Sequence, residues 1–216
     1  MAAALGLGLG PGDVPLSLGT SGTVYAVAPA GVADPEGEVA GFADATGGFL
    51  PLVCTLNATK VTDTVARWLG TDPEGLSALA MVGQPGPVLV PYFDGERTPN
   101  RPDATGLITG LRPSTTREEL ALAAHDGVLC GLFDGLDALR RTGVAVDGRL
   151  HLIGGGARSP AYRQRAADLH GERIVVPDTD ETVATGAAVQ AAAVLTADSA
   201  TDFTLAWGLG TGTTVE

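Results

Sequence analysis

Three consecutive glycines, residues 154–156, separate an apolar stretch from a stretch with helical spacing. The apolar residues within 144–153 indicate a strand, and those within 162–170 indicate a helix with Pro160 near its first turn. Glycine permits backbone conformations and close approaches that a side chain prevents, and a helix start offers unpaired N–H groups and a positive dipole end. This junction is therefore equally compatible with a nucleotide-binding turn and with a tight turn that binds nothing.

The composition is that of a globular protein and excludes several partners. The chain has 216 residues, a length that is enough to bury the core of one large or two small domains. Hydrophobic residues make up 44% of the chain and charged residues 18%. Its net charge of −12 argues against nucleic acid, because binding to the phosphate backbone depends on clustered Lys and Arg. Cys54 and Cys130 have no CxxC spacing, and the three histidines are scattered without a metal-ligand pattern. No apolar run is long enough to span a membrane, so we expect a cytoplasmic protein with no nucleic-acid and no membrane partner.

Periodicity along the chain predicts an α/β fold with a mixed sheet. Residues 14–29 predict a β-hairpin around the GTSGT turn, and strands are also predicted at 144–153, at 173–177 and at the start of 86–106, which continues as an irregular loop. The predicted helices are 58–69, 116–141, 162–170 and 181–195, with Ser114 or Thr115 as the cap of the longest and a short helix and glycine-rich tail after 198. Because the opening strands pair as a hairpin and the later ones connect through helices, the sheet should contain antiparallel and parallel pairs.

Four motifs, in this order along the chain, resemble the carbohydrate kinases of the FGGY family and, within that family, the xylulokinases. They are SLGTSGTVYAV, GFADATGGFLPL, PYFDGERTPNRPDATG, and GGGARSPAYRQRAADLHG followed by ETVATGAAVQAA. Four collinear motifs are more specific than the glycines alone. The resemblance implies an actin-like ATPase (ribonuclease H-like) fold, with residues 1–198 as the nucleotide-binding C-terminal domain and residues 199–216 as a tail.

The resemblance also implies that ATP, with Mg²⁺, lies along two turns. The LGTSGT turn would face the terminal phosphates through Thr20, Ser21, Gly22 and Thr23. Small hydroxyl side chains and turn amides suit phosphate oxygens, although a polar hairpin tip without a ligand has the same residues. The second turn would contact adenosine through Gly154, Gly155, Gly156, Ala157 and Ser159. No residue is predicted to bind a metal directly.

Further candidates for the cleft lie in the middle of the chain. Asn57 would sit along the nucleotide cleft, or it could cap the helix that follows it. Glu96 and Arg97, in the GERTP loop, could form an ion pair with each other or reach the sugar and phosphates. A charged loop is usually solvated, which favours the structural role. Asn100 stands where xylulokinases usually carry a histidine, and Gly186 is expected to serve helix packing.

The start of the chain differs from the family pattern. In the family, a GGGDN-like segment with the aspartate that acts as general base precedes a stretch like AAALGLG, and here Met1 stands at that border. The resemblance therefore implies that the base, the sugar-binding domain and its DxGT hairpin are absent, and nothing in the context of Asp13 or Asp44 suits either as a substitute. Phosphoryl transfer depends on positioning and proton transfer, so the chain alone should be inactive and D-xylulose should bind only with the missing domain. The interface left uncovered should favour self-association.

The resemblance thus predicts the nucleotide-binding half of a carbohydrate kinase, a phosphotransferase that phosphorylates D-xylulose at O5. Two alternatives remain open at this point. One is a non-catalytic ATP-binding actin-like module. The other is the corresponding half of a glycerol or other polyol kinase, because the choice of sugar is made mainly in the domain that is absent.

Overall fold

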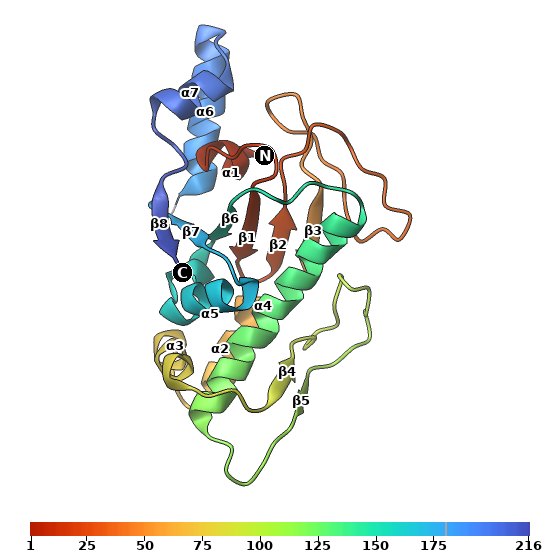
Figure 1. Cartoon of the computed structure of the whole chain (residues 1–216), viewed down its shortest axis with the longest axis vertical. Coiled ribbons are helices and arrows are strands. Elements are labelled where there is room, and N and C mark those ends of the chain that lie inside the picture. Colours follow the sequence, from red (N-terminus) through yellow and green to blue (C-terminus); the bar gives the residue numbers. More distant parts are fainter. Residues whose placement is uncertain (180) are drawn as a thin grey trace.

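A six-stranded mixed sheet forms the centre of the computed structural model, which describes residues 1–179 and 181–216 (Figure 1). The strand order is β3-β2-β1-β6-β7-β8. Their bounds are β1 Val14–Leu18, β2 Gly22–Tyr25, β3 Leu52–Thr55, β6 Leu150–Ile153, β7 Ile174–Pro177 and β8 Gly212–Val215. β1 pairs antiparallel with β2 and parallel with β6, and β6 pairs parallel with β7. The predicted α/β fold with a mixed sheet is confirmed.

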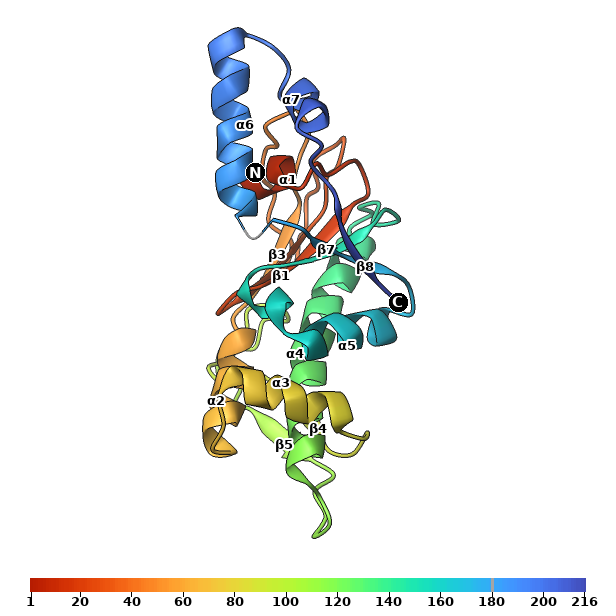
Figure 2. The same ribbon diagram turned by 90° about the vertical axis from the view of Figure 1, so that its left-hand side faces the viewer.

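Helices cover both faces of the sheet (Figure 2). One side carries α1 (Ala2–Gly6), α6 (Thr182–Thr196) and α7 (Ala200–Ala206), and the other carries α4 (Arg117–Arg141) and α5 (Pro160–His170). Around α4 also lie α2 (Thr59–Trp68), α3 (Pro73–Val82) and a small sheet of β4 (Val88–Val90) and β5 (Leu107–Thr109). A short 3₁₀ turn, η1 (Gly155–Arg158), links β6 to α5. Across the described residues, no helix combines the length and apolarity that a bilayer crossing would require.

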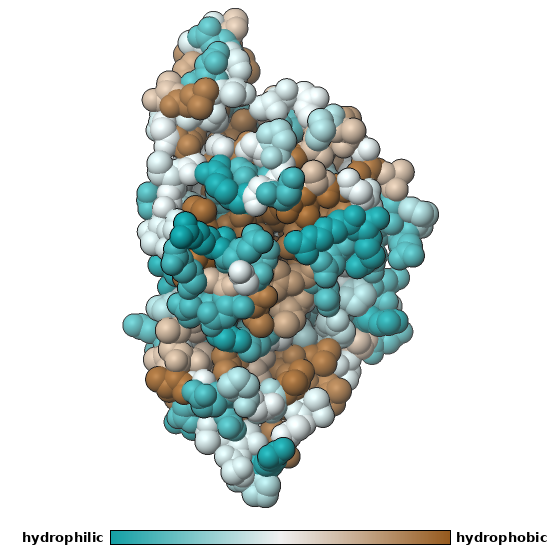
Figure 3. Space-filling model, in the orientation of Figure 1, coloured by the Kyte–Doolittle hydropathy of each residue, from teal (hydrophilic) through white to brown (hydrophobic). Residues whose placement is uncertain are grey.

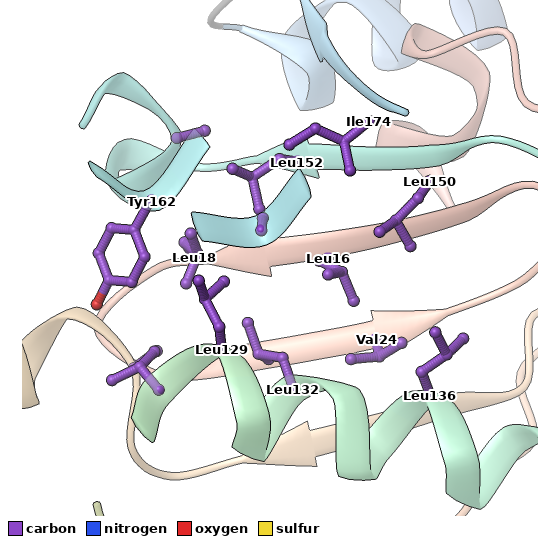
Figure 4. Packing of buried hydrophobic residues seen from close by; sticks show 14 of the residues in the cluster. Leu16, Leu18, Val24, Leu129, Leu132, Leu136, Leu150, Leu152, Tyr162 and Ile174 are labelled. Carbon is purple, nitrogen blue, oxygen red and sulfur yellow. The ribbon is translucent and has the colours of Figure 1, made fainter. Parts of the chain in front are cut away.

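The main core lies between α4 and the sheet (Figure 4). Leu129, Leu132 and Leu136 point from α4 toward Leu16 and Val24 on the strands, and each of these side chains is at most 1% exposed. Complete burial of one such side chain contributes about 1.5–3 kcal/mol. The long helix is therefore held by its apolar face, and it fixes the three antiparallel strands behind it.

The start of α4 differs slightly from the prediction. Thr116 is the cap, because its side chain accepts a hydrogen bond from the backbone N–H of Glu119 while the Glu119 carboxylate accepts one from Thr116 N. Such a reciprocal capping box satisfies two helix-end donors at once. Ser114 and Thr115 were the wrong choices, since the Thr115 hydroxyl instead accepts from the backbone of Arg112.

Three elements were missed or misjudged from the sequence. α3 was not predicted, although Asp72 accepts a hydrogen bond from Gly75 N at 2.7 Å and Pro73 follows it, which is a helix-start signal. β5 was not predicted either, and it follows directly after the irregular loop expected within 86–106. The prediction of a tail is wrong for 212–215, because these residues form β8 at the edge of the sheet. Gly212 permits this pairing, since a Cβ at that position would lie only 2.5 Å from the carbonyl oxygen of Val176.

The helices α1 and α6 cross with their backbones almost in contact. A Cβ on Gly186 would lie 1.7 Å from the carbonyl oxygen of Ala2, and one on Gly6 would lie 1.9 Å from that of Thr182. Neither distance is possible without separating the helices, so the predicted packing role of Gly186 is confirmed. The end of the first helix is thereby fixed above the parallel half of the sheet.

This contact predicts opposite effects for two glycine-to-alanine changes within helices. Gly186→Ala should lower the free energy of unfolding by about 1–3 kcal/mol, because the added methyl group overpacks the crossing. The matched control, Gly131→Ala in α4, should raise it by about 0.5–1 kcal/mol, because a Cβ there meets nothing within 4 Å and alanine is the better helix former. Urea denaturation of both variants measures the difference. A Gly186→Ala chain as stable as the unchanged one would contradict the close crossing.

Candidate functional site

A cleft of about 880 Å³ opens where the β1–β2 turn, α2, α3 and the β6–α5 junction meet. Its lining includes Thr20 from the first predicted turn together with Gly155, Gly156 and Ser159 from the second. The volume lies within the range of about 300–1,000 Å³ found for small-molecule sites. The fold therefore brings the two turns, which are far apart in the sequence, to one concave surface.

The three glycines have three different surroundings. Gly154 has a φ of +88°, and a Cβ there would lie 2.8 Å from Leu18 O. A Cβ on Gly156 would lie 2.7 Å from the Leu18 Cβ and 2.9 Å from the Thr59 Cγ2. A Cβ on Gly155 would have no atom of another part of the chain within 4 Å. The first and third glycines thus close the turn onto β1, and the second exposes bare backbone to the cleft.

The β1–β2 turn is held by the start of α2. The carbonyl oxygens of Gly19 and Thr20 accept hydrogen bonds from Thr59 N at 3.0 Å and Ala58 N at 3.3 Å. Thr20 is exposed and lines the cleft. Its hydroxyl therefore stands on a fixed backbone beside the glycine turn.

The other three predicted turn residues are placed differently. Gly22 packs inward, because a Cβ there would lie 2.5 Å from the Thr55 hydroxyl and 2.6 Å from Leu132. Ser21 is exposed and Thr23 is half-buried in β2, and neither belongs to the cleft lining. Of the four, only Thr20 shares the cleft with Gly155.

One wall of the cleft is fixed by a pair of serines. Ser159 caps α5 by accepting from Tyr162 N at 3.3 Å, and its hydroxyl lies 2.8 Å from that of Ser77 on α3. The Ser77 hydroxyl also accepts from Ala161 N at 3.2 Å. Ala157, in contrast, is 6% exposed and does not line the cleft. The sequence did not point to Ser77, because α3 was not predicted and an isolated serine does not indicate such a contact.

The deep end of the cleft is formed by Tyr162 and His125. The Tyr162 hydroxyl donates to the Thr62 hydroxyl at 3.2 Å, and the His125 ring packs against that of Tyr162 at an interplanar angle of 57°, with centroids 4.5 Å apart. His125 Nδ1 donates to Ala121 O at 2.8 Å, since a carbonyl can only accept. Burial lowers the pKa of His125 and raises that of Tyr162. Both side chains are therefore neutral at physiological pH.

Asn57, Glu96 and Arg97 form a separate cluster outside the cleft lining. Asn57 Nδ2 donates to Gly95 O at 2.6 Å and to Glu96 Oε2 at 2.9 Å. The other oxygen of Glu96 accepts from the backbone N–H groups of Leu56 and Arg97.

This cluster corrects two expectations. Glu96 is only 2% exposed, so it is not a solvated loop residue, and backbone amides and Asn57 replace the expected Arg97 guanidinium as its partners. A buried carboxylate needs such donors to offset its lost hydration. The alternative role of Asn57 as a helix cap is also wrong, because Ala58 is the cap residue of α2.

Charged side chains at the rim of the cleft come from α2, α3 and η1. They are the carboxylates of Asp63 and Glu74 and the guanidinium of Arg158. Within residues 1–179 and 181–216, no three His, Cys, Asp or Glu side chains gather closely enough to hold a metal ion.

Comparison with known proteins agrees with this architecture. The model of the FGGY family of carbohydrate kinases, C-terminal domain, matches residues 14–195. Xylulose kinases of Streptomyces coelicolor and Streptomyces rubiginosus are each 47% identical, over 98% and 100% of this chain and 43% and 44% of their own lengths. The solved structure of xylulose kinase from Bifidobacterium adolescentis has 48% identity and a TM-score of 0.82, covering 92% of this chain and 40% of that one.

The chain thus spans less than half the length of these relatives while matching nearly all of its own length. The comparisons confirm the actin-like ATPase fold that the four motifs predicted, and they confirm the resemblance to the FGGY family that those motifs carry. The family match, the strand order and the two turns at one cleft agree, and we conclude that the chain belongs to the FGGY family of carbohydrate kinases, as its C-terminal domain.

Proposed function

We propose that this chain is the nucleotide-binding part of an ATP-dependent sugar kinase that transfers phosphate to O5 of D-xylulose. The observation that carries the proposal is the meeting of Thr20 and Gly155 in one cleft. The sugar is proposed from the xylulose kinases that align with nearly the whole chain. Because those proteins are more than twice as long as the aligned part, the residues that bind the sugar and take its proton are proposed to lie outside this chain.

The cleft suits ATP with its adenosine over Gly155 and its phosphates near Thr20. Adenosine needs a surface free of side chains, and Gly155 supplies one, since a Cβ there meets no protein atom within 4 Å. Phosphate needs hydrogen-bond donors, which the Thr20 hydroxyl and the turn amides can supply. Mg²⁺ would neutralise phosphate charge, and bound phosphates with water would provide its ligands.

Within a complete kinase, this part would position the transferred phosphate. The β1–β2 turn is tied to α2, and the glycine turn is tied through Ser159 to α3. A rigid cradle of this kind reduces the entropy lost when phosphate and sugar hydroxyl are aligned for transfer. The chain's own residues therefore bind and orient ATP, and the acceptor side is left to the rest of the protein.

The isolated chain is also proposed to self-associate. Large apolar side chains are exposed near the ends of α6 and α7, including Val194 at 85%, Leu195 at 87% and Leu205 at 75%. Hydrophobic patches also interrupt the hydrophilic surface on the face shown in Figure 3. Exposed apolar surface of this kind favours association with a partner or with a second copy.

The glycine turn can be tested by adding a side chain where the protein leaves room. Gly155→Val should weaken ATP binding at least tenfold, because the branched side chain would occupy the space proposed for adenosine. The fold should survive, since nothing lies within 4 Å of the added Cβ. Isothermal calorimetry measures the affinity and circular dichroism checks the fold. The matched control is Gly131→Val, which also adds a side chain in open space but lies outside the cleft. Equal ATP affinity in both variants would exclude the Gly155 assignment.

The phosphate turn can be tested by removing one hydroxyl. Thr20→Val is nearly isosteric, and it should weaken ATP binding by about tenfold while leaving adenosine binding unchanged, because only phosphate contacts are lost. Thr23→Val serves as the control, since Thr23 lies in β2 away from the cleft lining. Competition binding with ATP and adenosine gives both affinities. A similar loss for the two ligands would mean that Thr20 acts through the fold.

Catalysis can be tested on the chain alone and on a joined protein. The 216-residue chain alone should consume no ATP in response to D-xylulose, because the acceptor hydroxyl and its base are not positioned. Joining it to the N-terminal half of an aligned xylulose kinase should restore turnover with D-xylulose in a coupled assay. Glycerol and gluconate are tested in the same assay, and turnover with one of them in place of D-xylulose would indicate a different sugar kinase. Phosphorylation by the lone chain would contradict the proposed division, and ATP binding without turnover by the joined protein would indicate a non-catalytic module.

A further inference from the structure

A second cavity, of about 210 Å³, lies on the α1 side of the sheet. It is bounded by the end of α1, by β6, and by the chain just after β7 and after α7. Its polar and aromatic lining consists of His151, Asp178, Thr179, Trp207 and Thr211. None of these residues belongs to the cleft proposed for ATP.

His151 is the unusual member of this lining. It is 1% exposed, and neither of its ring nitrogens has a hydrogen-bond partner among the described residues. Its neighbours in β6, Leu150 and Leu152, belong to the core packed against α4. Because side chains alternate along a strand, His151 faces the opposite side, where the cavity lies. Buried polar atoms in native proteins nearly always have a partner, so these two nitrogens call for one.

The carboxylate of Asp13 lies near the ring but is not a hydrogen-bond partner of His151. Asp13 Oδ2 lies 4.0 Å from His151 Nε2, which is beyond hydrogen-bond distance. Asp13 instead accepts from the backbone of Gly10 at 3.0 Å and from Arg149, whose Nη2 lies 2.8 Å away. Burial, and then the nearby Arg149 charge, lower the pKa of His151 to about 4. The ring is therefore neutral at pH 7, with one nitrogen that donates and one that accepts.

The surroundings restrict what could bind to such a ring. An anion would meet the carboxylate of Asp178 in the lining, and a cation could not accept a hydrogen bond from the protonated nitrogen of the neutral His151 ring, so a neutral molecule is favoured. A hydroxyl group both donates and accepts, as the neutral ring and the hydroxyls of Thr179 and Thr211 require. The cavity is smaller than the roughly 300 Å³ at which sites for larger ligands begin, so a nucleotide does not fit.

We propose that this cavity binds a small neutral polyol, of about the size of glycerol to a five-carbon sugar alcohol, through His151. The hydroxyls of the ligand would bond to the imidazole and the two threonines, and its carbon chain would lie against Trp207. The site is independent of the ATP cleft and of the proposed kinase activity.

The first experiment reads ligand contact on the unmodified chain. The protein has three histidines, so ¹⁵N-histidine labelling gives one ring-nitrogen signal set each for His125, His151 and His170. Titration with glycerol and xylitol should shift the His151 ring nitrogens saturably and leave the other two histidines unchanged. Sodium acetate is the anionic comparison. The absence of a saturable shift at His151, or a shift with acetate only, would overturn the proposal.

The second experiment uses the other reporter in the cavity. The chain has two tryptophans, so Trp68→Phe leaves Trp207 as the sole source of tryptophan fluorescence. In that background, xylitol should change the emission saturably. His151→Phe should weaken the response about tenfold, whereas His151→Gln, which keeps a donor and an acceptor, should retain most of it. Equal affinity in the Phe and Gln variants would contradict a contact through the imidazole, and if either variant fails to fold, the histidine spectra decide.

Discussion

The parallel pairing of β1 with β6 is the constraint on which the rest of this structure depends. Val14 lies opposite Leu150 and Ser17 opposite Ile153, so the two strands run in the same direction and end at the same edge. The turns that follow them must therefore emerge side by side. This edge of a parallel pair is where ligand sites form in open α/β sheets, because the strands end there and helices begin. The cleft that holds Thr20 and Gly155 is a direct result of that register.

Close backbone contact then determines which of the turn residues pack against β1 and which are exposed to the cleft. Gly154 and Gly156 are needed because β1 lies too near for any side chain, and their replacement would disturb the strand pair itself. Gly155 has no such neighbour. The same reasoning separates Thr20, which is exposed at the turn, from Gly22, which packs against Thr55 and Leu132. A motif of like residues thus contains both inward-packed and cleft-lining positions, and only packing distinguishes them.

The two faces of β6 have different chemistry for a simple geometric reason. Leu150 and Leu152 join the core under α4, while His151, between them, faces the layer of α1. Gly6 and Gly186 hold α1 against α6, so the end of that short helix stays fixed next to the cavity that His151 lines. The cleft proposed for ATP, at one edge of the sheet, and the small polar cavity beneath the opposite layer therefore share no lining residue.

The sequence by itself determined the local elements and the family. Helical spacing located α2, α4, α5 and α6 to within a few residues, because an apolar face repeats every three or four residues wherever a helix packs on a core. The ordered motifs identified the FGGY C-terminal domain. Tertiary structure decided what local pattern cannot encode. It placed Thr20 but not Thr23 in the cleft, buried Glu96 under backbone amides, joined Ser77 to Ser159, and added β8 to the sheet edge. Each of these depends on a contact between segments distant in sequence, and no periodicity within one segment reports where another will lie.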